Sequence, residues 1–211
     1  LGLSNTSTTA ANPAINPKPP YDPLTDFTPI VSLASSPNIL AVTASFPAKD
    51  YKGFVDAVRK NPGKFTYASS GIGANSNLQM ELFKMSTGTF IIHVPYRGSG
   101  PALTDTVGGQ VSMILDQVPT SLPFIRSGKP VPIAVAAPSR LKELPDVPTF
   151  KEVGLEQVNR MAYYGIYGPK GLPEEVVKKV HDGGVKAFQD PAVRKRIEET
   201  GSLVNVRGPV E

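Results

Sequence analysis

The 211-residue sequence contains no cysteine and only two histidines. Without cysteine, disulfides, thiolate metal sites and cysteine nucleophiles are excluded, and the redox compartment stays undetermined. Neither His93 nor His181 belongs to a His-x-x-x-His or Glu-x-x-His pair, so we expect no metal site. His93 lies in an apolar segment and His181 on the exposed side of a predicted helix, and both positions favour structural roles.

Long apolar runs and clusters of one charge are also missing. No apolar run approaches the 18 residues that a membrane-spanning helix needs. The 22 basic and 18 acidic residues give a net charge of +4, and the one dense basic run, Arg194-Lys195-Arg196, is followed at once by Glu198 and Glu199. This pattern is typical of a solvated helix face, so we expect no nucleic-acid partner.

Enzyme signatures are equally scarce. Ser99 lies between two glycines, but no Gly-x-Ser-x-Gly elbow is present, and a hydrolase triad is unsupported. We therefore expect a protein that is not an enzyme and that carries no cofactor. The sequence opens at Leu1 without a signal-peptide pattern, from which we expect either a removed leader or a fragment.

The middle of the chain has the alternation of strands and helices that builds an α/β fold with a parallel sheet. We expect two strand segments within 27–45 that meet at Ser35-Ser36-Pro37, and a fully apolar central strand at 90–94. Residues 12–26 carry five prolines and should lack regular structure. Further strands are predicted at 64–67, 111–115, 130–137 and 163–167. Helices are predicted at 49–60, 119–126, 173–188 and 191–200. Three more helices are predicted by one end only: one begins near Asn75, one ends at Val107, and one begins within 144–149.

The strand–turn–helix segment around Gly71 and Gly73 is the strongest candidate site. A turn of glycines and small polar residues that leads into a helix presents backbone N–H groups and the positive end of the helix dipole, which favour an anion. A plain N-capped βα turn is the alternative. Asn77 should matter less than the backbone donors. The predicted ligand-binding residues of this turn are Ser69, Ser70, Gly71, Ile72, Gly73, Ala74, Asn75 and Ser76.

Three further residues are predicted to contact a ligand. Asp116 ends a strand at the edge of the sheet where open α/β folds place ligand groups, and we expect it to bind a ligand hydroxyl, an amine or a bridging water. The alternative is a cap for the helix at Pro119. Asn5 and Thr6 belong to a small polar run after a strand, which either offers contacts to a ligand or forms a loose terminus.

A dinucleotide site is the competing interpretation of the same turn. Gly71-Ile72-Gly73 follows a strand and opens a helix, as the Rossmann fingerprint requires. However, Ser76 replaces the third glycine, and the expected acidic residue is missing. Arg97 lies near that point and suits a 2′-phosphate, so an NADP-binding enzyme stays open as an alternative.

Several segments together resemble the solute receptors of tripartite tricarboxylate transporters, the Bug-type periplasmic binding proteins. The segments follow the family's order and spacing over nearly the whole chain, and the run that begins at His93 is specific. They are Asn61–Lys64, Tyr67–Gly73, His93–Leu103, Gly108–Val111 and Leu144–Thr149, with Tyr21–Pro23, Asp26–Pro29 and Gly165–Pro169.

The resemblance implies a type II periplasmic-binding-protein fold, in which two α/β domains joined by crossing strands close on a hinge around a small carboxylate. The second domain would span 44–132, the first would comprise 1–43 and 133–211, and the crossing segments would be Val31–Thr43 and Ile133–Ala137. Family members place a further glycine-rich loop before the position of Leu1, so the first domain would be incomplete here.

The resemblance also implies a location and partners. We expect a receptor in the periplasm of a Gram-negative bacterium, which presents a dicarboxylate or similar organic acid to the membrane subunits of a tripartite transporter. Self-association through the incomplete first domain is expected as well, because uncovered sheet edges and apolar faces recruit partners. A truncated remnant that binds nothing is the remaining alternative.

Overall fold

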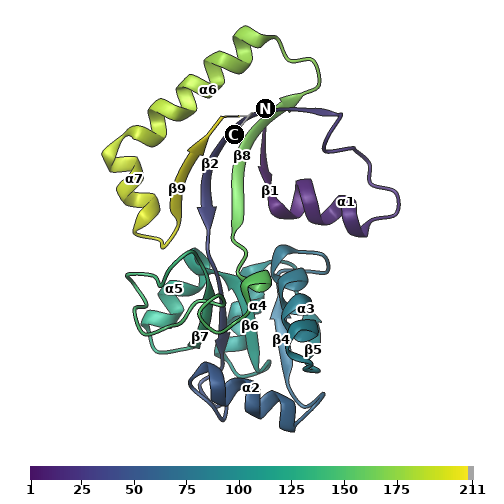
Figure 1. Cartoon of the computed structure of the whole chain (residues 1–211), viewed down its shortest axis with the longest axis vertical. Helices are drawn as coiled ribbons and strands as arrows, with labels where there is room; N and C mark the ends of the chain where they lie inside the picture. The colour runs from purple at the N-terminus through teal and green to yellow at the C-terminus, as the bar shows by residue number, and fades with distance from the viewer. Residues whose placement is uncertain (209–211) are drawn as a thin grey trace. The chain divides into compact units, whose positions relative to one another are not determined.

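The computed structural model describes residues 1–208 and divides the chain into two compact units (Figure 1). Unit 1 comprises the two ends of the chain, up to Ser36 and from Ala162 onward, and unit 2 comprises Pro37–Met161. Among the described residues, no helix is both long enough and apolar enough to cross a membrane. Both units combine strands and helices, in agreement with the predicted α/β class.

Unit 2 is built on a five-stranded sheet in the order β5-β4-β6-β3-β7. β4 is parallel to β5 and to β6, whereas β3 is antiparallel to β6 and to β7, so the predicted parallel sheet contains one reversed strand. The strands are β3 (Asn38–Val42), β4 (Thr66–Ser69), β5 (Ile92–Pro95), β6 (Met113–Gln117) and β7 (Val131–Ala136).

Helices cover both faces of this sheet. The alternation of side chains along β3 places Leu40 and Val42 toward one face and Ile39 and Ala41 toward the other. The first face packs against α2 and α3, and the second against α4 and α5. The helices are α2 (Tyr51–Lys60), α3 (Asn75–Thr87), α4 (Ser99–Val107) and α5 (Val118–Arg126).

Local sequence explains where the helices of unit 2 begin and end. The Asp50 carboxylate accepts the backbone N–H of Gly53 at 2.8 Å and caps α2, whose apolar face contributes Phe54 and Val58 to the core. α3 ends at Gly88, which adopts the left-handed conformation that favours glycine at a helix C-terminus. The helix predicted to start within 144–149 is absent: that segment forms turns, followed by the short helix η2 (Glu156–Val158).

Unit 1 contains an antiparallel sheet in the order β1-β8-β2-β9. α6 packs on β2. Val177 and Val180 of α6 belong to the same apolar cluster as Ile30 and Val31 of β2. The elements are β1 (Gly2–Asn5), β2 (Phe27–Ser36), β8 (Ala162–Pro169), β9 (Leu203–Arg207), the π-helical turn η1 (Ser7–Ala11), α1 (Asn12–Ile15), α6 (Glu174–Gln189) and α7 (Pro191–Glu198).

The structure sets the boundaries between the units differently from the domain limits implied by the resemblance. The chain passes from unit 1 to unit 2 at Ser36-Pro37, between β2 and β3, where the sequence predicts a kink. It returns at Met161-Ala162, before β8. Ile133–Ala137, predicted to cross, instead belongs to unit 2, because β7 pairs along its length with β3.

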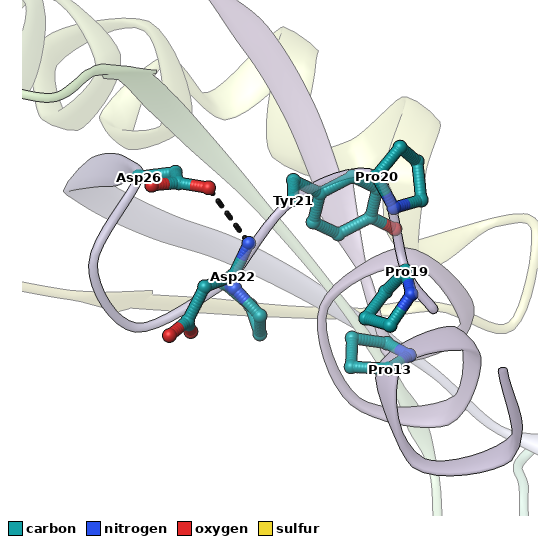
Figure 2. A pocket seen from close by; sticks show the side chains of 7 residues that line it. Pro13, Pro19, Pro20, Tyr21, Asp22 and Asp26 are labelled. Atoms are coloured by element: carbon teal, nitrogen blue, oxygen red, sulfur yellow. Dashed lines mark hydrogen bonds between the residues drawn. The ribbon is translucent and has the colours of Figure 1, made fainter. Parts of the chain in front are cut away.

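The proline-rich loop 12–26 contains more structure than expected. It begins with the short helix α1, and the hydroxyl of Tyr21 donates to the carbonyl of Thr8 at 2.6 Å. Figure 2 shows the open pocket of about 440 Å³ that this loop forms, where the Asp26 carboxylate accepts the backbone N–H of Asp22 at 2.7 Å. None of the predicted ligand-binding residues lines this pocket.

Unit 1 exposes several apolar side chains. Leu1, Leu3 and Leu24 are 74%, 70% and 88% exposed. Leu24 also lines a groove of about 350 Å³ with Phe27, Tyr163 and six other residues of unit 1. Self-association through this surface stays a prediction.

Candidate functional site

The candidate site of unit 2 lies where three parallel strands end. β4, β5 and β6 run in the same direction, so their carboxyl ends meet at one edge of the sheet. The turn after β4, the loop after β5 and Asp116 near the end of β6 all lie at this edge. Open α/β sheets bind ligands at such edges, because the helices that follow direct their N-termini there.

The turn from Ser69 to Ser76 is held by bonds within itself. The backbone N–H of Gly71 donates to the Ser69 hydroxyl at 3.2 Å, that of Ser70 to the Ser76 hydroxyl at 3.4 Å, and that of Ala74 to the carbonyl of Gly71 at 3.3 Å. Several of the donors predicted for a ligand are therefore engaged inside the turn.

Gly73 is engaged in the same way. Its φ of +72° is in the left-handed region that disfavours side chains. Its N–H donates to Oδ1 of Asn77 at 2.9 Å. The Asn77 side chain is buried, and through this bond it contributes more to the structure of the turn than the sequence suggests.

The N-terminus of α3 is the part of the turn that suits an anion. Its N-cap residue is Ala74, whose extended backbone is typical of a cap but whose side chain accepts no hydrogen bond. The first N–H groups of a helix have no partner within the helix. Before them, the tip of the turn is Ile72, with 78% of its surface exposed. An anion at this point would be stabilised by the positive end of the helix dipole.

The loop after β5 is tied to the turn and to Asp116. The backbone N–H of Gly98 donates to the carbonyl of Ser70 at 3.2 Å, and that of Tyr96 to the carbonyl of Ser69 at 3.1 Å. The next residue, Ser99, begins α4, and its hydroxyl donates to Oδ1 of Asp116 at 2.6 Å.

Asp116 is buried and accepts from hydroxyl groups of two helices. Oδ2 accepts from Thr120 at 2.5 Å and from Ser121 at 3.4 Å, both in the first turns of α5. The predicted alternative, a backbone cap for that helix, is not what the structure contains: the N-cap is Gln117, without a side-chain cap bond. The carboxylate instead joins β6 to the starts of α4 and α5.

The side chain of His93, on β5, contacts the turn, and the sequence did not indicate this contact. Its Nε2 lies 2.7 Å from the Ser69 hydroxyl, and its ring stacks on Tyr67 with 4.6 Å between centroids. The two residues are register partners on the parallel strands β4 and β5. Burial lowers the pKa of His93, and the nearby Lys84 adds to this, while the Glu81 carboxylate opposes it.

Tyr67 connects this region to an ion pair on α3. Its hydroxyl donates to Oε1 of Glu81 at 2.5 Å, and Lys84 bonds the same carboxylate at 2.7 Å. Burial, followed by the bond to Glu81, raises the pKa of Tyr67, so the phenol stays protonated. Burial by itself would raise the pKa of Glu81, but the bonds from Lys84 and Tyr67 lower it.

The other predicted site residues lie in unit 1 or on the surface. The side-chain oxygen of Asn5 accepts the N–H of Thr8 at 3.0 Å, and the Thr6 hydroxyl accepts the N–H of Tyr163 at 3.2 Å, so the polar run forms an ordered turn. Arg97, which the dinucleotide alternative requires, is exposed after β5. Over residues 1–208 no cluster of three or more His, Asp or Glu side chains is placed to hold a metal ion.

Comparison with known proteins identifies the family. A "Structure of a periplasmic transporter" aligns with a TM-score of 0.94 and 46% identity over 99% of this chain and 70% of that one. Rpa4515 of R. palustris with adipate aligns at 0.92 and 30%, with the same coverage. MatC (Rpa3494) of Rhodopseudomonas palustris with bound malate aligns at 0.86 and 34%, over 96% of this chain and 69% of MatC.

The match to the family model extends over most of the sequence. Residues 1–206 match the model described as "Tripartite tricarboxylate transporter family receptor". The chain spans about half the length of the first curated relatives it matches, 55% of each. The fold is accordingly that of periplasmic binding proteins, among them BugD, which aligns with a TM-score of 0.84 and 33% identity over 96% of this chain and 67% of BugD. This chain belongs to the tripartite tricarboxylate transporter receptor family.

Proposed function

We propose that this chain is a solute receptor without enzymatic activity, which binds a small carboxylate and presents it to the membrane subunits of a tripartite transporter. Membership of the receptor family supports this role. The adipate and malate bound to two related structures support a dicarboxylate or similar organic acid as the ligand. The similarity to a periplasmic transporter of known structure supports a periplasmic location, as in a Gram-negative bacterium.

The observation that carries the proposal is the uncapped start of α3 within unit 2. Because Ser70, Gly71 and Gly73 use their N–H groups inside the turn, an external carboxylate would approach at the exposed Ile72 and at the positive end of the α3 dipole. α3 has 13 residues, long enough to develop a dipole at its N-terminus. A carboxylate group placed there would be stabilised by that positive end.

The proposal is tested by placing a carboxylate of the chain itself at the same point. Ala74→Asp puts an acceptor at the N-cap, where the backbone already has cap geometry (φ −65°, ψ 155°). Such a cap stabilises a helix by about 0.5–2 kcal/mol. We therefore expect the variant to be more stable than the parent chain and to lose affinity for adipate and malate, because its own side chain occupies the donors.

Isothermal calorimetry and ligand-dependent thermal unfolding of the 211-residue chain measure these effects. Pro173→Asp is the matched control, since it places the same charge at the N-cap of α6 in unit 1 and should leave the affinity unchanged. Unchanged affinity in Ala74→Asp would refute the site. If no carboxylate of a broad panel stabilises the parent chain at millimolar concentration, the receptor role of this chain fails and the non-binding alternative is supported.

A further inference from the structure

The side chains behind the turn form a chain of hydrogen bonds whose direction is fixed from one end. Lys84 has only donors and bonds the carboxylate of Glu81, which has only acceptors. The hydroxyl of Tyr67, 2.5 Å from Glu81, must therefore be the donor of that bond. Its single hydrogen is then used, and its oxygen is left to accept.

The orientation of the Asn77 amide follows from this. Nδ2 lies 2.7 Å from the Tyr67 hydroxyl and donates to it, which directs Oδ1 to the N–H of Gly73 at 2.9 Å. The opposite orientation would set two acceptors against each other at Tyr67 and two donors against each other at Gly73. Since Asn77 is buried, neither conflict would be relieved by water.

The same amide selects the tautomer of His93. Nδ1 lies 3.4 Å from Nδ2 of Asn77, which only donates, so Nδ1 must accept and the ring proton must be on Nε2. Nε2–H then donates to the Ser69 hydroxyl at 2.7 Å, and Ser69 directs its own hydrogen to the carbonyl of Gly71 at 3.1 Å. The donor and acceptor roles set at Lys84 thus extend to Ser69 at the start of the turn and to Gly73 within it.

We propose that Asn77 and His93 are positioning residues for the carboxylate site, which hold Gly73 and Ser69 in the conformation that the turn adopts in front of α3. This inference rests on the function proposed above. Neither residue needs to touch the ligand. Their contribution depends on a neutral imidazole, because a proton on Nδ1 would oppose the NH₂ group of Asn77 and displace it from Gly73.

The proposal predicts that binding weakens on acidification. The charged groups acting on His93 are Glu81, which favours the imidazolium, and Lys84, which opposes it, both from α3; Tyr67 of β4 stacks on the ring. Burial is the largest influence and lowers the pKa of His93 below its ordinary value of 6.5. Carboxylate affinity should therefore be constant at neutral pH and fall only as the pH approaches this lowered pKa.

The tautomer can be measured without any ligand. The chain has two histidines, so two-bond ¹H–¹⁵N spectra of ¹⁵N-histidine-labelled protein resolve both, and His181→Gln assigns the pair. At pH 7.5 we expect His93 to be neutral and protonated at Nε2. A charged ring or an Nδ1–H tautomer at that pH overturns the hydrogen-bond assignment, whatever the protein binds.

The link to binding is tested with Asn77→Asp, which keeps the size of the side chain and replaces the donor group with an acceptor. The new carboxylate should draw a proton to Nδ1 of His93, change its ¹⁵N signature at neutral pH, and weaken adipate or malate binding at least about tenfold. Gln157→Glu, the same amide-to-acid change at an exposed position, should alter neither measurement.

Two outcomes separate this inference from the proposed function. If Asn77→Asp changes the His93 signal while calorimetric affinity stays within twofold, the positioning role is refuted and the receptor function stands. If Ala74→Asp leaves affinity unchanged, the carboxylate site itself is refuted. Should Asn77→Asp fail to fold, His93→Gln in the parent chain replaces it, and pH-independent affinity equal to the parent's would refute the positioning role.

Discussion

The clearest quantitative prediction concerns the buried carboxylate of Asp116. It accepts hydrogen bonds from Ser99 and Thr120 at 2.6 and 2.5 Å, and a longer one from Ser121 at 3.4 Å. A hydrogen bond to a charged group contributes about 1.5–3 kcal/mol. Asp116→Ala removes the two short bonds and leaves the buried Ser121 hydroxyl without this acceptor.

Part of that loss is offset, because removing the carboxylate also removes the desolvation cost of a buried charge. We therefore expect Asp116→Ala to lower the free energy of unfolding by about 2–4 kcal/mol. Asp116→Asn should cost about half as much, since the amide oxygen still accepts one bond and a rotated hydroxyl accepts from the NH₂ group.

Urea unfolding followed by circular dichroism measures both variants, with an unchanged m-value as the condition for comparing them. Asp56→Ala, at an exposed position on α2, is the control and should change stability by no more than about 0.5 kcal/mol. A loss below about 1 kcal/mol for Asp116→Ala would refute the reasoning. Lost carboxylate affinity at unchanged stability would instead favour the direct ligand contact that the sequence suggests.

Three further predictions concern stability. In α6, Gly183→Ala should raise the free energy of unfolding by about 0.5–1 kcal/mol. Gly184→Ala should raise it less, because its Cβ would lie 3.3 Å from the Val31 side chain. Urea unfolding of both variants is the test, and equal increases would contradict the prediction. Gly165→Ala should destabilise strongly, since its Cβ would lie 2.8 Å from the Val31 carbonyl; a parent-like melting temperature would refute this. Because the folded-state pKa of His93 is lowered, the unfolded chain binds the proton more readily, and the free energy of unfolding should fall as the pH drops from 6.5 toward that lowered pKa. Plots of unfolding free energy against pH for the parent and for His93→Gln should differ in this pH range, and identical plots would count against the prediction.

Much of the fold could be predicted because it depends on local signals. The apolar spacing over 49–60 and the Asn-Pro-Gly stop predicted α2, and the helices at 119–126 and 173–188 correspond to α5 and α6. Proline at position 37 has no N–H to donate, and the predicted kink there separates β2 from β3. The order of strands and helices was sufficient for the α/β class, and several segments taken together over nearly the whole chain, with the specific run that begins at His93, were sufficient for the family.

Predictions from local composition were wrong where the place of a strand depends on its neighbours in the sheet. The apolar run at 90–94 predicted a central strand, but β5 lies at the edge of the sheet, with Phe90 59% and Ile92 44% exposed. An apolar sequence indicates a strand without specifying how many partners cover it. β9 was missed although its alternating valines are typical of a strand, because a single short strand at the end of a chain has no local partner to confirm it.

The turn at 69–76 could be singled out from the sequence, because glycine and helix-start signals are local. The sequence did not determine which of its donors are already used. That depends on Asn77, Tyr67 and His93, and the parallel pairing of β4 with β5 brings His93 to within hydrogen-bonding distance of Ser69. Pairing between strands depends on the packing of the whole sheet. The sequence was therefore enough to predict a glycine-rich turn as a candidate anion site, but the side chains that hold the turn could be identified only in the folded structure.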